Sequence, residues 1–150
     1  MITIESKYDF PSTLIERAVH AALTHHASRE SLDVNLSVVL TDNRRLHKLN
    51  MDYLGVDAPT DVLSFPASES DPETGARYIG DILISVPYAT KGAKQAGNSL
   101  EAELQLLVVH GVLHLLGHDH AKPKEKAKMW KAQAEILKSL GLGDVVIREE

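Results

Sequence analysis

The chain has 150 residues, 43% of them hydrophobic and 25% charged, which is typical of a soluble globular protein with one sizeable core. Its net charge of −5 at pH 7 excludes the overall basic field of most nucleic-acid-binding proteins, although a local basic patch is enough for binding. The absence of cysteine excludes disulfides and thiolate zinc fingers. Any metal ion must therefore be held by histidine and carboxylate.

Neither the first residues nor the apolar segments point to a membrane or to secretion. Residues 1–5 lack the basic and apolar regions of a secretory signal. No apolar stretch is as long as a membrane-spanning helix. No linker, repeat or low-complexity tract divides the chain. We therefore expect a protein with no membrane partner, folded as a single domain over residues 1–150.

Hydrophobic periodicity predicts strands where apolar and polar residues alternate or form a short apolar run, and helices where apolar residues share one helical face. In chain order, the predicted elements are a strand over 2–7, a helix over 11–28, a strand over 34–40, a short helix that Thr41 or Asp42 caps and that carries Leu46 and Leu49, strands over 62–65 and 78–86, and helices over 87–96, 100–116 and 123–140. This order predicts a single α+β domain in which helices cover one sheet.

Two segments rich in glycine, proline and polar residues predict exposed loops. The first spans residues 51–60, and the second spans residues 66–77, beginning where Pro66 ends a short strand.

Asn98, followed by Glu101, resembles a capping box and predicts the start of a helix. That helix is apolar nearly all round up to Leu116, so we expect it to be buried in the domain.

Four of the eight histidines lie within the eleven residues from His110 to His120, at the end of this apolar helix. Buried imidazoles need partners, so this clustering favours a shared metal ion over unrelated core histidines. His110 and His114 lie one helical turn apart on the same face.

The third ligand follows from the spacing. On a straight helix His118 would lie about 12 Å along the axis from His110, whereas zinc–nitrogen bonds are only about 2.0–2.1 Å long. A turn at Gly117 instead returns His120 to the first two histidines.

Three histidines with a fourth position open for water are typical of a catalytic zinc site. The spacing resembles the metzincin pattern HExxHxxGxxH, but Gly111 stands where those peptidases have the glutamate that acts as general base. Zinc can still lower the pKa of bound water to near ~7 and polarise a phosphoryl or carbonyl oxygen. We therefore expect a hydrolase, with a peptide substrate disfavoured.

The whole segment, HGVLHLLGHDH over residues 110–120, closely resembles the HGxLHLxGYDH signature of the YbeY family of single-domain, metal-dependent endoribonucleases. Residues 49–53 with 59–66, and residues 79–85, are similar to two further motifs of that family. The resemblance implies an α+β fold with a four-stranded mixed sheet covered by about five helices. It also implies one zinc ion per chain, held by His110, His114 and His120 at the end of a central buried helix.

The same resemblance implies a function. It predicts a cytoplasmic, zinc-dependent endoribonuclease specific for single-stranded RNA, with no DNA partner expected. The enzyme would act in maturation of the 3′ end of small-subunit ribosomal RNA and in ribosome quality control. Its partners would be ribosomal RNA and the small ribosomal subunit.

Two residues depart from the family pattern. Leu54 stands where the family usually has an arginine that serves RNA binding or catalysis, and leucine cannot pair with phosphate. Either Arg44, Arg45 or one of the lysines clustered between residues 122 and 131 substitutes for it, or RNA cleavage is weakened. His118 replaces a tyrosine and, with Asp81, is a further candidate for substrate binding. No side chain is assigned as the catalytic acid or base.

Two other functions are compatible with the sequence. One is a zinc hydrolase of a non-RNA substrate such as a peptide or small amide, against which the missing glutamate argues. The other is a non-catalytic, ribosome-associated factor that its metal ion stabilises, a hypothesis that Leu54 keeps open.

Overall fold

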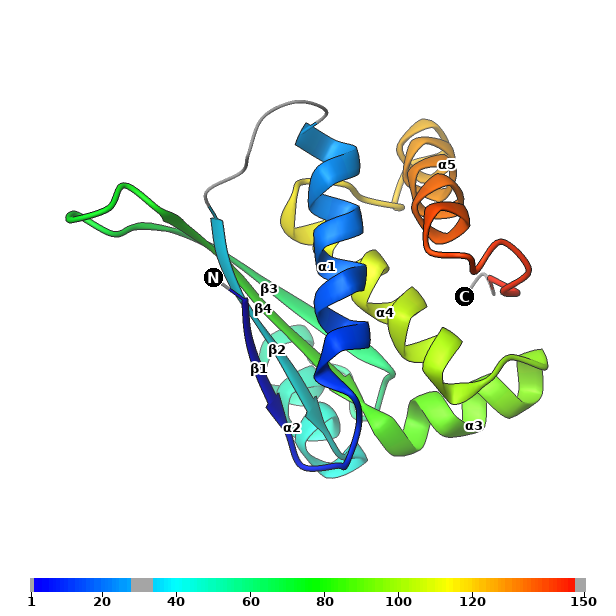
Figure 1. Ribbon diagram of the computed structural model, residues 1–150. Coiled ribbons are helices and arrows are strands. Elements are labelled where there is room, and N and C mark those ends of the chain that lie inside the picture. Colours follow the sequence, from blue (N-terminus) through cyan, green and yellow to red (C-terminus); the bar gives the residue numbers. More distant parts are fainter. Residues whose placement is uncertain (1, 28–33, 148–150) are drawn as a thin grey trace.

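The chain, seen in a computed structural model, is described over residues 2–27 and 34–147. These residues form four strands and five helices (Figure 1). In chain order they are β1 (Ile2–Ser6), α1 (Ser12–Ala27), β2 (Val34–Thr41), α2 (Asn43–Leu54), β3 (Val62–Ser70), β4 (Arg77–Ser85), α3 (Val86–Ala96), α4 (Leu100–Leu115) and α5 (Pro123–Ser139). The predicted end of the first helix at Ser28 lies outside the described residues. The predicted α+β class is confirmed.

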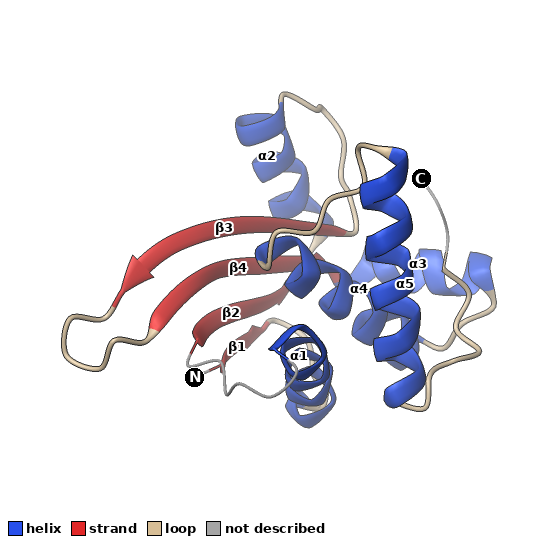
Figure 2. Cartoon of the chain, turned by 90° about the horizontal axis from the view of Figure 1, so that it is seen from above, coloured by secondary structure: helices blue, strands red, loops and turns tan. Residues whose placement is uncertain are grey.

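The four strands form one mixed sheet in the order β1-β2-β4-β3. The strands β1, β2 and β4 are parallel, whereas β3 pairs antiparallel with β4 at the edge. The predicted four-stranded mixed sheet is therefore confirmed. Figure 2 shows that the β3–β4 hairpin extends well beyond the other two strands.

Most of the helices cover one face of this sheet. Leu36, Val38 and Ile82 point toward α1 and α4, and each is at most 1% exposed. The helix α4 lies at the centre of the domain, against α1, α3, α5 and both strands of the hairpin, which confirms its prediction as a buried helix. By contrast, α2 lies on the opposite face of the sheet (Figure 1). Within the described residues, no helix is long and apolar enough to cross a membrane.

Two glycines let the C-terminal end of α4 lie directly on the sheet. A Cβ atom at Gly111 would stand 2.8 Å from the side chain of Ile82, closer than real Cβ atoms approach. Gly80 has φ +140°, and a Cβ there would stand 2.3 Å from the Phe65 carbonyl oxygen and 2.7 Å from the Leu115 side chain. This close packing places the last turn of α4 beside the start of the edge strand.

The prediction that Pro66 ends a strand is wrong. The strand β3 continues to Ser70, so the predicted loop over residues 66–77 shrinks to a short hairpin turn before β4. Because β3 is an edge strand, a proline can join it without removing a hydrogen bond from the interior of the sheet. The pairing of β3 with β4 is irregular between Pro66 and Glu69.

The predicted loop over residues 51–60 also begins too early, because α2 continues to Leu54. Gly55 ends this helix in a left-handed conformation, and its N–H reaches the carbonyl oxygens of Asn50 and Met51. At the other end of the helix, the Asp42 side chain accepts a hydrogen bond from the Arg45 N–H. The predicted cap at Asp42 is thus confirmed.

The cap of α4 differs by one residue from its prediction. The hydroxyl of Ser99, rather than the Asn98 side chain, accepts the N–H of Ala102 at 3.1 Å. Asn98 instead bonds both the N–H and the carbonyl oxygen of Val146, each at 3.0 Å. This long-range contact holds the C-terminal segment against the start of α4. The residues next to Asn98 in the sequence give no indication of it.

We expect Gly80→Ala to lower the free energy of unfolding by about 3 kcal/mol. The added Cβ would strain the backbone at this positive φ, and it would also clash with the Phe65 carbonyl oxygen. Urea unfolding measures this change. Gly97→Ala is the matched control, because Gly97 also has a positive φ, of +78°, but nothing lies within 4 Å of its added Cβ. It should cost about 1 kcal/mol. Equal losses in the two variants would show that close packing at Gly80 is unimportant.

Candidate metal centre

The end of α4 and the segment that follows it bring three imidazoles together. The Nε2 atoms of His110 and His114 lie 3.1 Å apart. After α4 the chain turns at Gly117, which has φ +100°, and the ring of His120 comes to 5.6 Å from that of His110 and 5.1 Å from that of His114. One ring nitrogen from each of the three lies within 4.8 Å of the others. These residues could therefore hold one metal ion.

The side chain of His118 points to a different place. Its ring lies 6.4 Å from that of His26, and it lines a separate hollow with Asp119 and Lys128. Its backbone carbonyl oxygen, however, faces the Nδ1 atom of His114 at 3.0 Å. The turn at Gly117 thus brings His120, rather than the His118 side chain, to the first two histidines.

Two hydrogen bonds orient the imidazoles. A carbonyl oxygen only accepts, so the Nδ1 of His114 donates to the His118 oxygen, and its Nε2 keeps a lone pair. In the same way, the Nδ1 of His110 donates to the side-chain oxygen of Gln133 at 3.0 Å. The lone pairs of the two Nε2 atoms therefore point toward each other and repel. A cation bound between the two atoms would remove this repulsion.

The donor set fits a zinc ion. Two ligands of a tetrahedral zinc with bonds of about 2.0–2.1 Å have nitrogen atoms about 3.3 Å apart, close to the 3.1 Å between His110 and His114. Hydrogen bonds that the second ring nitrogen donates, such as those to the oxygens of Gln133 and His118, are the usual support of metal-binding histidines. The residues present thus have the chemistry of a three-histidine metal site, and the spacing of His110 and His114 matches that of two zinc ligands.

The protonation state also suits metal binding. Burial, with a smaller contribution from His114, lowers the pKa of His110 to about 4, although the hydrogen bond with Gln133 acts in the opposite direction. Burial and the nearby His120 also lower the pKa of His114. A lowered pKa keeps an imidazole neutral at pH 7, and the neutral form is the one that binds metal.

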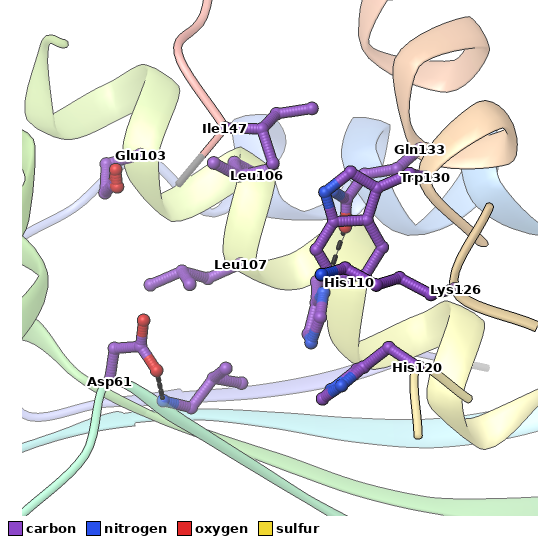
Figure 3. Close-up of a pocket in the computed structure, with 11 residues that line it drawn as sticks. Asp61, Glu103, Leu106, Leu107, His110, His120, Lys126, Trp130, Gln133 and Ile147 are labelled. Atoms are coloured by element: carbon purple, nitrogen blue, oxygen red, sulfur yellow. Dashed lines mark hydrogen bonds between the residues drawn. The ribbon is translucent and has the colours of Figure 1, made fainter. Parts of the chain in front are cut away.

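His110 and His120 form one side of a pocket of about 130 Å³ (Figure 3). The pocket lies between α4, the first half of α5 and the start of β3. The other residues that line it are Asp61, Val62, Glu103, Leu106, Leu107, Lys126, Trp130, Gln133 and Ile147.

Asp61 and Gln133 are the residues of this site that the sequence analysis missed. One carboxylate oxygen of Asp61 accepts the Val62 N–H at 2.8 Å. This hydrogen bond holds the Asp61 side chain beside the first residue of β3. Asp61 belongs to the upstream motif that resembles the YbeY family, but nothing local shows that it faces histidines fifty residues later. Gln133 belongs to no recognisable motif. It is a single polar residue on the buried face of α5, so the sequence around it does not indicate its role.

The other predicted substrate-binding residues lie away from this pocket. Arg45 and Asp81 line a hollow with Glu5 and Ser37 on the opposite face of the sheet. Asp81 stands in the middle of β4, and it accepts a hydrogen bond from the Tyr78 hydroxyl. Because neighbouring residues of a strand face opposite sides, Ile82 points toward α4 and Asp81 points away from the histidines.

The two remaining positions that the sequence singled out are on α2. Arg44 lies in its first turn, near enough to Lys7 and Asp42 to act on the pKa of each. Leu54 ends the helix with 65% of its surface exposed. Neither residue lines the histidine pocket.

Comparison with known proteins gives one consistent family. The family model described as "Endoribonuclease YbeY" matches residues 1–141. A protein of that name from Brevibacillus brevis is 42% identical over 141 residues, covering 86% of each chain. Another, from Shouchella clausii, is 41% identical over 153 residues, covering 95% of this chain and 96% of the relative. A solution structure of a Thermotoga maritima protein is similar with a TM-score of 0.60 and 28% identity, covering 100% of this chain and 99% of that one.

We expect the purified protein to bind one zinc ion per chain and His114→Ala to lose most of it, because this change removes one ligand of three. His118→Ala is the matched control: it removes an imidazole from the same segment but leaves the carbonyl oxygen that orients His114. It should keep its zinc. Metal analysis by mass spectrometry measures both, with circular dichroism to verify folding. Equal zinc content in the two variants would contradict the assignment.

Proposed function

Because the chain belongs to the YbeY family, as the match over residues 1–141 shows, we propose that it is a zinc-dependent endoribonuclease specific for single-stranded RNA. Its role is the maturation of the 3′ end of small-subunit ribosomal RNA, together with ribosome quality control, in the cytoplasm. Its partners are ribosomal RNA and the small ribosomal subunit. The observation that carries the proposal is the convergence of the His110, His114 and His120 imidazoles beside a pocket that a carboxylate also lines.

The residues that would hold the zinc ion are His110, His114 and His120. When bound, zinc polarises a phosphoryl oxygen and lowers the pKa of water, which is the chemistry that phosphodiester hydrolysis needs. The side chain of Gln133 and the carbonyl oxygen of His118 keep two of the imidazoles in the required tautomer.

Asp61 would supply the general base. In zinc peptidases the base is a glutamate directly after the first histidine, and here that position is Gly111, whose added side chain would run into Ile82. Asp61 brings a carboxylate to the same pocket from the start of β3. One of its oxygens accepts the Val62 N–H, which gives the carboxylate a fixed orientation in this pocket.

The phosphate contacts of this chain would come from the lysines of α5 rather than from Arg44 or Arg45. Lys126 lines the histidine pocket itself, and Lys122, Lys124 and Lys128 stand within one turn of it along the chain. Arg45, by contrast, lines a hollow on the opposite face of the sheet. A lysine acts on a phosphate as a mobile point charge, so this cluster can contact an RNA backbone that enters beside the histidines.

One alternative keeps specific support. Leu54 gives the end of α2 an exposed apolar residue where the family usually has an arginine. A non-catalytic, ribosome-associated protein with a stabilising metal ion would tolerate this loss of charge. A zinc hydrolase of a non-RNA substrate has no such observation in its favour.

The first test is cleavage of single-stranded RNA. We expect His114→Ala to abolish cleavage and Asp61→Asn to reduce kcat about 10²-fold or more, the range of a general base. The asparagine keeps the oxygen that accepts the Val62 N–H, so folding should not change. Asp57→Asn is the matched control in the same loop: Asp57 is exposed and pairs with His47 at 2.6 Å outside the pocket. Full cleavage by the zinc-free His114→Ala variant would refute the proposal.

The second test concerns position 54. We expect Leu54→Arg to tighten RNA binding and to steepen the slope of log affinity against log salt by about 0.7, the value for one added phosphate contact on a single strand. Leu54→Gln changes the polarity without adding charge and serves as the control. If the two variants bind RNA equally at all salt concentrations, the end of α2 does not contact the RNA backbone.

A further inference from the structure

The wall that α5 contributes to the histidine pocket carries two N–H donors without acceptors. Neither the indole nitrogen of Trp130 nor the amide nitrogen of Gln133 has a hydrogen-bond partner within residues 2–27 and 34–147, although both atoms are buried. The Gln133 side chain is 0% exposed, and its oxygen is engaged with His110. Buried donors are nearly always paired in folded proteins, so this pair marks a place where an acceptor binds.

The two donors belong to one surface. Trp130 and Gln133 are three residues apart on α5 and therefore lie on the same helical face, and both line the pocket. Figure 3 shows the indole nitrogen turned toward Leu106 and Ile147, into the space above His110. The ring of Trp130 lies 6.0 Å from that of His110 and 5.7 Å from that of His120. An acceptor bonded to these donors would thus stand beside the metal centre.

The remaining walls restrict the size and polarity of the ligand. They consist of four apolar residues, Val62, Leu106, Leu107 and Ile147, together with the acidic residues Asp61 and Glu103. The volume of about 130 Å³ lies well below the roughly 300–1,000 Å³ of pockets that take drug-sized ligands. The pocket therefore suits a single flat ring with apolar faces and an acceptor on its edge. The ammonium group of Lys126, 5.5 Å from the centre of the Trp130 ring, favours an electron-rich acceptor.

We propose that this pocket is a pyrimidine-base subsite, in which Trp130 and Gln133 donate hydrogen bonds to a carbonyl oxygen of the base. Uracil and cytosine are single rings that carry such an oxygen, whereas adenine is larger and has none. Proteins read single-stranded RNA by taking unstacked bases into pockets of this kind. This inference rests on the proposed nuclease function and extends it: the enzyme selects a pyrimidine next to the bond that it cleaves.

Trp130 itself reports on binding, because it is the only tryptophan in the chain. We expect UMP and CMP to change its fluorescence saturably, with a dissociation constant about tenfold or more below that of AMP. Ribose 5-phosphate, which has the phosphate but no base, should leave the emission unchanged. Equal responses to UMP, AMP and ribose 5-phosphate, or no response to any of them, would overturn the subsite.

A variant tests the donor directly. Trp130→Phe keeps an aromatic ring but removes the N–H, so we expect KM for a pyrimidine-containing RNA to rise about five- to tenfold, the worth of one hydrogen bond. The preference over an adenine-only RNA should shrink by the same factor, and the zinc content should stay unchanged. Lys138→Ala, on the exposed side of the same helix, is the control and should alter none of these values. An unchanged base preference in Trp130→Phe would refute the role of the indole.

The outcomes separate the two proposals. Cleavage of uracil-rich and adenine-only RNA at equal rates, with no nucleotide effect on Trp130, overturns the subsite and leaves the nuclease function standing. Selective binding of UMP by a protein that cleaves no RNA overturns the nuclease function and supports the pocket as a pyrimidine-nucleotide site.

Discussion

The close packing of the end of α4 against the β3–β4 hairpin is the constraint on which the rest of the site depends. Gly111 lies against Ile82, and Gly80 leaves room for the Phe65 carbonyl oxygen and the Leu115 side chain. A larger residue at either position would push the helix away from the sheet, and the histidines at its end would move with it. The hydrophobic core thus holds the three histidines in place.

This packing also explains why the chemistry is distributed over several elements. In a zinc peptidase the base follows the first histidine on the same helix, but in this fold that position points into the sheet. The carboxylate that shares the pocket comes instead from Asp61, at the start of the edge strand, and the residue that orients His110 comes from α5. The site is assembled by three elements that are distant in sequence, so it exists only when the domain is folded.

Two of the failed predictions have the same physical cause. The strand end at Pro66 and the cap of α4 are predicted from residues within a few positions, whereas longer-range contacts decide them in the structure. Pro66 is tolerated because its strand lies at an edge, which depends on the order of all four strands. Asn98 does not cap α4, because its side chain is bonded to Val146. The long periodic elements, such as α4 and β2, were predictable because one buried face requires the same pattern along the whole element.

The sequence by itself determined the fold class, the buried helix and the three histidines, since four-residue spacing on a helix and a turn at Gly117 suffice to bring their rings together. Only the tertiary structure decided what surrounds them. Strand alternation turned Asp81 away from the site, and α2 took Arg45 to the other face of the sheet. Asp61, Trp130 and Gln133 reached the histidines because β3 and α5 pack beside α4. Spacing along a chain specifies neighbours within one element, whereas neighbours between elements depend on how the core packs.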